Sequence, residues 1–261
     1  MHLHALPVLY ALFVWWFSTG AILYLDGLPR RTFVWSMAGA TIVLGVALYG
    51  TARSSADASL TGAYCAFTCA LLIWGWHEMA FLMGFVTGPR TTPCPPEARG
   101  LTHLRHAIAV VAWHELALAF TGVAIWAMTA GQPNQFALWT FAILWAMRIS
   151  AKINVYLGVL NLTEEFLPAH LKYLASYFSR KPMNLFFPFS TTLSIVAAVV
   201  LAQNARGDDF TITGFTFLAM LMALAVLEHW FLVVPIPASA LWNWGLRSRE
   251  TSGRVAVAKA F

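Results

Sequence analysis

The chain has 261 residues, of which 59% are hydrophobic and only 10% are charged, and it contains 12 Trp and 19 Phe. A soluble domain usually carries about 25% charged residues, so these side chains could not cover a water-exposed surface. The composition therefore excludes soluble, disordered and disulfide-scaffold proteins and predicts a protein that crosses a membrane several times. The formal net charge of +5 does not indicate nucleic-acid binding, because the basic residues are scattered singly and form no basic stripe.

Long apolar runs, separated by Pro, Gly and charged residues, define the expected helices. A helix needs roughly 20 residues to cross a bilayer, and it pairs its own backbone groups, as lipid requires. We predict an all-α fold in which residues 1–261 form a single integral membrane domain. Its expected transmembrane helices, about seven in number, cover residues 5–25, 33–51, 60–87, 106–130, 136–159, 187–204 and 212–235.

A further segment, residues 163–179, has the pattern of an amphipathic helix. Leu167, Leu171 and Leu174 fall on one helical stripe, and charged residues interrupt it. We expect this helix to lie on the cytoplasmic surface of the membrane.

The distribution of basic residues predicts the orientation of the chain. With seven spans, most of the 16 Lys and Arg residues lie on the side of the C-terminus. Because cytoplasmic loops carry an excess of Lys and Arg, we expect the N-terminus outside and the C-terminus in the cytoplasm.

Three doublets of His and Glu lie inside expected spans, which is unusual because an ionisable group in a membrane costs a few kcal/mol. At about 1.5 Å per residue, each doublet would lie roughly 12 to 15 Å below the cytoplasmic surface. They are therefore expected at one level, facing the interior of the bundle. The doublets are His77-Glu78, His114-Glu115 and Glu228-His229.

Further His and Glu residues are expected at the cytoplasmic mouth of the same cavity, so the sequence predicts a metal site. Mixed imidazole and carboxylate ligands from several helices suit two non-haem iron ions, or manganese or zinc. The Glu-x-x-His spacing of ferritin-like di-iron proteins is absent from these spans. The candidate ligands are His77, Glu78, His103, His106, His114, Glu115, Glu164, His170, Glu228 and His229.

Two other interpretations of these residues stay open. A lone His from a span could be the axial ligand of a tetrapyrrole. Alternatively, the His and Glu side chains could pair with Arg148, Lys152, Trp indoles and one another and so hold the bundle together. Arg148 and Lys152, four residues apart in one span, would then neutralise buried carboxylates; otherwise they could bind an anionic substrate group such as a propionate.

Three stretches of the chain resemble the photosynthetic complex assembly protein 2 family of purple phototrophic bacteria: Trp76 to Arg90, His103 to Glu115, and Arg148 to Pro168. The resemblance implies a multi-pass protein of the bacterial inner membrane, cytoplasmic or intracytoplasmic. It also implies a link to the reaction-centre and light-harvesting apparatus, in the genetic neighbourhood of the reaction-centre H subunit and of bacteriochlorophyll synthesis. The family has no demonstrated activity, so no catalytic residue follows from it.

Two functions are consistent with these observations. The first is an integral membrane factor for assembly or maturation of the photosynthetic apparatus, with reaction-centre or light-harvesting subunits, or bacteriochlorophyll-synthesis proteins, as its partners. Its proline-rich loop, residues 88–96, would be a docking surface. The alternative is a membrane-bound metalloenzyme, a di-iron-type oxidoreductase acting on a tetrapyrrole or another lipophilic substrate.

Overall fold

The computed structural model describes residues 2–162 and 164–249. The structure is 76% helical and has no strand among the described residues, which confirms the all-α prediction. Six of its helices are long and apolar enough to cross a membrane, and the number is seven if one bent pair forms a single span. The orientation of the chain in the membrane stays a prediction.

The helices agree with most of the expected spans to within a few residues. In chain order they are α1 His2–Asp26, α2 Phe33–Ser54, α3 Leu60–Leu82, α4 Gly100–Ala109, α5 Ala112–Thr129, α6 Phe136–Leu157, α7 Phe186–Asn204 and α8 Asp209–Phe231, with 3₁₀ helices η1 Arg30–Thr32, η2 Glu164–Phe166, η3 Ala169–Tyr177 and η4 Ala238–Trp242.

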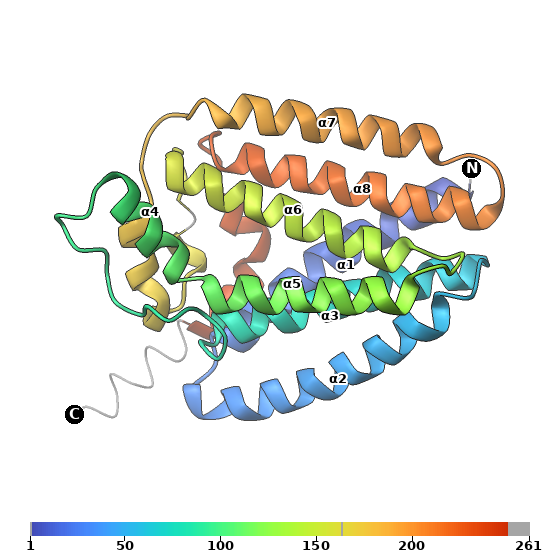
Figure 1. Cartoon of the computed structure of the whole chain (residues 1–261), viewed down its shortest axis with the longest axis horizontal. Helices are drawn as coiled ribbons and strands as arrows, with labels where there is room; N and C mark the ends of the chain where they lie inside the picture. The colour runs from blue at the N-terminus through green and yellow to red at the C-terminus, as the bar shows by residue number, and fades with distance from the viewer. Residues whose placement is uncertain (1, 163, 250–261) are drawn as a thin grey trace.

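The helices run roughly along one direction, with α2 and α7 on opposite outer sides and α3, α6 and α8 between them (Figure 1). More than half of the span of α3 is buried, whereas only about a fifth of α2 and of α7 is buried. The segment that contains α4 and the loop before it lies at one end of the bundle, which we call the loop end (Figure 1). The centre of the fold is therefore built around α3.

Away from the loop end, the helices meet through apolar side chains. Phe67 of α3 and Phe217 of α8 stack with ring centroids 4.2 Å apart. Gly214 of α8 lies so close to Phe136 of α6 that a Cβ atom would come within 1.9 Å of the Phe136 ring. We call this region, which contains Phe67, Phe136, Phe217 and Gly214, the apolar half of the bundle.

The expected span 106–130 is wrong in one respect, because the structure breaks it into α4 and α5, which meet at an angle of 60°. The cause is the loop that follows α3. The backbone N–H of His114, in the first turn of α5, donates to the carbonyl of Thr87 at 2.9 Å, and the N–H of Arg90 donates to the carbonyl of Ala109 at the end of α4. The loop thus satisfies backbone groups that a break in a helix would leave unpaired.

The expected amphipathic helix at 163–179 is also corrected, although Thr163 lies outside the described residues. The structure has two 3₁₀ helices there, η2 and η3, and Pro168 precedes the second one. Leu171 and Leu174 are buried against Phe81 and Val110 of the bundle. This apolar stripe therefore packs on protein at the loop end and does not face the membrane surface.

Candidate functional site

The three His/Glu doublets of the spans, together with Arg148 and Lys152, lie in the half of the bundle nearer the loop end. Six of these residues, from α3, α5 and α6, form a group that we call the ion-pair cluster. Its members are His77, Glu78, His114, Glu115, Arg148 and Lys152.

Two ion pairs attach α6 to its neighbours. Nη2 of Arg148 donates to Oε2 of Glu78 on α3 at 3.0 Å. One turn further along α6, Nζ of Lys152 donates to Oε1 of Glu115 on α5. Residues four apart lie on the same helical face, so the spacing lets α6 bind two different helices. The structure thus shows the neutralisation of carboxylates that was one of the interpretations of Arg148 and Lys152.

The two histidines of the cluster lie in its interior. His77 and His114 are 3% and 1% exposed, and their ring centroids are 6.4 Å apart. Nε2 of His77 lies 2.9 Å from the hydroxyl of Thr121, whereas the Nδ1 atoms of both rings are buried without a hydrogen-bond partner among the described residues. Both imidazoles therefore have a free hydrogen-bonding position inside the bundle.

The Glu78–Arg148 pair also has free positions. A guanidinium and a carboxylate can form two parallel hydrogen bonds, but here only Nη2 and Oε2 are joined. Oε1 of Glu78 and Nε of Arg148 are buried and have no described partner. Because the Arg148 side chain is 41% exposed and that of Glu78 only 12%, the guanidinium can hold a further polar group.

The third doublet makes different contacts. Oε1 of Glu228 accepts a hydrogen bond from the indole of Trp15 at 2.6 Å, which joins α8 to α1. Nδ1 of His229 donates to the carbonyl of Ala225, so its Nε2 accepts from the hydroxyl of Ser150 on α6 at 2.9 Å. Each member of this doublet thus links α8 to another helix.

The remaining candidate ligands lie outside the ion-pair cluster. His103 of α4 hydrogen-bonds the hydroxyl of Tyr156 at 3.2 Å, and Nδ1 of His106 is buried without a described partner. His170 packs beside Gly84, just after α3. Burial and the nearby charge of Arg30 lower the pKa of His170, so its neutral form is favoured.

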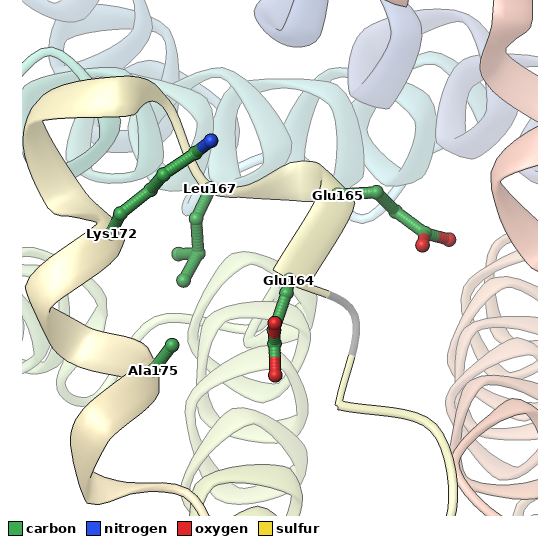
Figure 2. Close-up of a pocket in the computed structure, with 5 residues that line it drawn as sticks. All are labelled: Glu164, Glu165, Leu167, Lys172 and Ala175. Atoms are coloured by element: carbon green, nitrogen blue, oxygen red, sulfur yellow. The ribbon is translucent and has the colours of Figure 1, made fainter.

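Glu164 lines a separate pocket of about 420 Å³ at η2 and η3, with Glu165, Leu167, Lys172 and Ala175 (Figure 2). The carboxylate of Glu164 forms an exposed ion pair with Arg180 at 3.6 Å. In Figure 2 the side chain of Glu165 points away from that of Lys172. The pocket therefore has charged groups of both signs around its wall.

The predicted metal role of these ten residues stays a prediction. Within residues 2–162 and 164–249, no three or more His, Cys, Asp or Glu side chains form a group that could hold a metal ion. Two of the carboxylates that would be ligands are engaged by Arg148 and Lys152 instead.

The expected depth of the doublets requires a correction. Glu78 lies four residues before the end of α3, Glu228 three residues before the end of α8, and His114 in the first turn of α5. These positions are about 3 to 6 Å from the helix ends at 1.5 Å per residue, compared with the roughly 12 to 15 Å expected. The doublets do share one level, because all three lie near the same end of the bundle.

Trp indoles were expected as partners of the buried His and Glu side chains, but three individual partners were not identified from the sequence. They are Trp15, Thr121 and Trp145, whose indole donates to Oε2 of Glu115 at 3.0 Å. Trp145 lies three and seven residues before Arg148 and Lys152, so the helical period would have placed it on their face. No comparable signal exists for Trp15 or Thr121, which come from other helices.

Comparison with known proteins gives a family and a relative. Residues 1–253 match the family described as "Protein of unknown function (DUF3623)". The chain is 41% identical over 256 residues to the "Uncharacterized 30.4 kDa protein in puhA 5'region" of Rhodobacter capsulatus, covering 94% of this chain and 92% of that protein. No solved structure matches the chain.

Proposed function

The chain belongs to the DUF3623 family, and we propose that it is an integral membrane factor for assembly or maturation of the photosynthetic reaction-centre and light-harvesting apparatus. One observation carries this proposal: its relative in Rhodobacter capsulatus is described by its position in the puhA 5' region, and puhA belongs to a photosynthesis gene cluster. The membrane would then be the bacterial inner membrane in which that apparatus is built.

The arrangement of the helices supports a role in contacting other membrane proteins. The outer helices α2 and α7 have large exposed apolar side chains, including Trp35 and Tyr49 on α2 and Phe189 and Leu193 on α7. In a bilayer such faces meet lipid or another transmembrane helix. The ion pairs between α6 and its neighbours would keep the inner helices in one arrangement and so fix the positions of these faces.

A deletion strain tests the proposal. In a phototrophic bacterium that lacks the gene, we expect weaker near-infrared absorption bands of the reaction centre and light-harvesting complexes in isolated membranes. The full-length chain should restore them. The variant Lys152→Met should restore them poorly, because it leaves Glu115 without its ion-pair partner.

The control is Arg206→Gln, since Arg206 is exposed in the turn between α7 and α8. This variant should restore the bands fully. Unchanged bands in the deletion strain would contradict the assembly role. Capture of reaction-centre or light-harvesting subunits by cross-linking to the full chain in native membranes would support it independently.

A further inference from the structure

Helix α4 has an exposed apolar stripe that no described part of the chain covers. Leu101 is 78% exposed and Ile108 is 56% exposed, and Leu104 lies between them on the same face. Residues three, four and seven apart share one side of a helix. The opposite side, with His103 and Ala107, packs on the protein. Helix α4 therefore packs on the protein with one side and exposes its apolar stripe on the other.

Basic residues flank this stripe. Arg99 precedes α4, and Arg105 lies among the exposed apolar residues. Neither arginine side chain forms a hydrogen bond or an ion pair with any described residue. The exposed Glu97 precedes Arg99 but forms no ion pair with either arginine, and no acidic residue lies between Ala98 and Trp113. The face therefore keeps a net positive charge.

The bend after α4 sets this helix at an angle of 60° to α5. Helix α5 has 18 residues, or about 27 Å, which is close to the thickness of the hydrocarbon core. Together α4 and α5 qualify as one bent candidate span. Trp113, 54% exposed at the start of α5, is the kind of residue that gathers at the membrane–water boundary.

Helix α5 also has exposed apolar side chains, Trp113, Leu116 and Phe120. In a membrane protein such side chains meet lipid or another helix. A basic helix with an exposed apolar stripe, set at an angle to the helix that follows it, fits the boundary of a bilayer.

We propose that α4 is an interfacial anchor that inserts Leu101, Leu104 and Ile108 into the bilayer surface and binds the phosphate of anionic phospholipids through Arg99 and Arg105. The guanidinium groups pair with headgroup phosphate, and the leucine and isoleucine side chains replace exposed apolar surface. This contact fixes the level of the loop end, and hence of the ion-pair cluster, relative to the membrane surface.

The test uses the full-length protein in vesicles and a fluorophore on α4. Leu101→Cys is labelled with bimane in a background that lacks Cys94, and vesicles contain brominated phosphatidylglycerol or brominated phosphatidylcholine as quencher. We expect strong quenching by both lipids, with a severalfold preference for phosphatidylglycerol. In Arg99→Gln/Arg105→Gln most of this preference should be lost, because both arginines that attract the anionic headgroup are removed.

Two controls separate this contact from general effects. Arg206→Gln, at the opposite end of the bundle, should keep the preference, and a label at Thr102→Cys, beside the apolar stripe, should be quenched less than one at Leu101→Cys. Equal quenching by both lipids, or equal loss of preference in Arg206→Gln, would overturn the proposal. Quenching of the label by aqueous iodide is compared in vesicles and in native membranes. If the label were protected from iodide in native membranes but not in vesicles, a protein partner would cover α4, and the proposal would also be overturned.

Discussion

In the apolar half, α3 meets α8 through the stacked rings of Phe67 and Phe217, whereas near the loop end α3 meets α6 through the ion pair of Glu78 with Arg148. Lipid is as apolar as these side chains, so helices gain little hydrophobic free energy by meeting in a membrane. The apolar half must therefore depend on close fit. The ion-pair cluster depends on directional pairs that fix which helix lies beside which.

The same helix changes from one mode to the other along its length. Ala63, Ala66 and Ala70 of α3 are buried and allow close approach in the apolar half. From His77 onward, α3 instead places polar groups toward α5 and α6. The two halves should consequently respond differently to substitution.

The largest expected effect comes from removing one partner of an ion pair in the cluster. Lys152→Met leaves the Glu115 carboxylate without its cation inside the membrane. Because both side chains are about a quarter exposed, we expect a loss of roughly 2 to 3 kcal/mol, less than for a fully buried pair. Unfolding of the detergent-purified protein in increasing SDS measures it.

The double variant Glu115→Gln/Lys152→Met is the matched control. It removes both charges, so its stability should return to within about 1 kcal/mol of the wild type. If the double variant were as unstable as Lys152→Met, the effect would come from lost packing and not from an unpaired charge.

In the apolar half, the sharpest test is Gly214→Ala. The added Cβ would meet the ring of Phe136, and overpacking of this kind costs about 1 to 3 kcal/mol. Thermal unfolding in detergent should show the loss. Gly45→Ala is the control, because nothing lies within 4 Å of the position; it should be neutral or stabilise the helix by up to about 1 kcal/mol. Equal effects of the two substitutions would argue against close fit.

A smaller effect is expected for Glu78→Gln, because its partner Arg148 is 41% exposed and partly screened. The expected loss is about 1 kcal/mol or less. Glu164→Gln, whose pair with Arg180 is exposed at 3.6 Å, should show no measurable change in the same SDS titration. A loss for Glu78→Gln as large as that for Lys152→Met would mean that the two ion pairs are energetically equivalent.

The smallest expected signal is the metal content of the purified protein. Because Glu78 and Glu115 pair with cations, we expect substoichiometric iron, manganese and zinc in elemental analysis, and no tetrapyrrole absorption. Near-stoichiometric metal would instead support the predicted metal site and the metalloenzyme alternative. A tetrapyrrole spectrum would assign the histidines to pigment or haem binding.

Local patterns predicted the parts of the fold that depend on neighbouring residues. The long apolar runs set α1, α2, α6 and α7 closely. Ser59 caps α3, which begins at the expected residue 60, whereas Asp208 caps α8 and begins it three residues before the expected residue 212. The doublets were also predicted to share one level, and Arg148 and Lys152 to share one face. These features follow from helical periodicity and from the cost of unpaired polar groups in lipid.

The sequence by itself therefore determined a multi-pass helical membrane protein with its ionisable groups near one end of the bundle. Only the tertiary structure decided that residues 106–130 break, because the carbonyl that accepts from the first turn of α5 belongs to Thr87, in another segment. Tertiary contacts likewise decided that Glu78 and Glu115 pair with α6 and that α4 exposes its apolar face. Such partners come from distant parts of the chain, and local periodicity has no information about which helices will be neighbours.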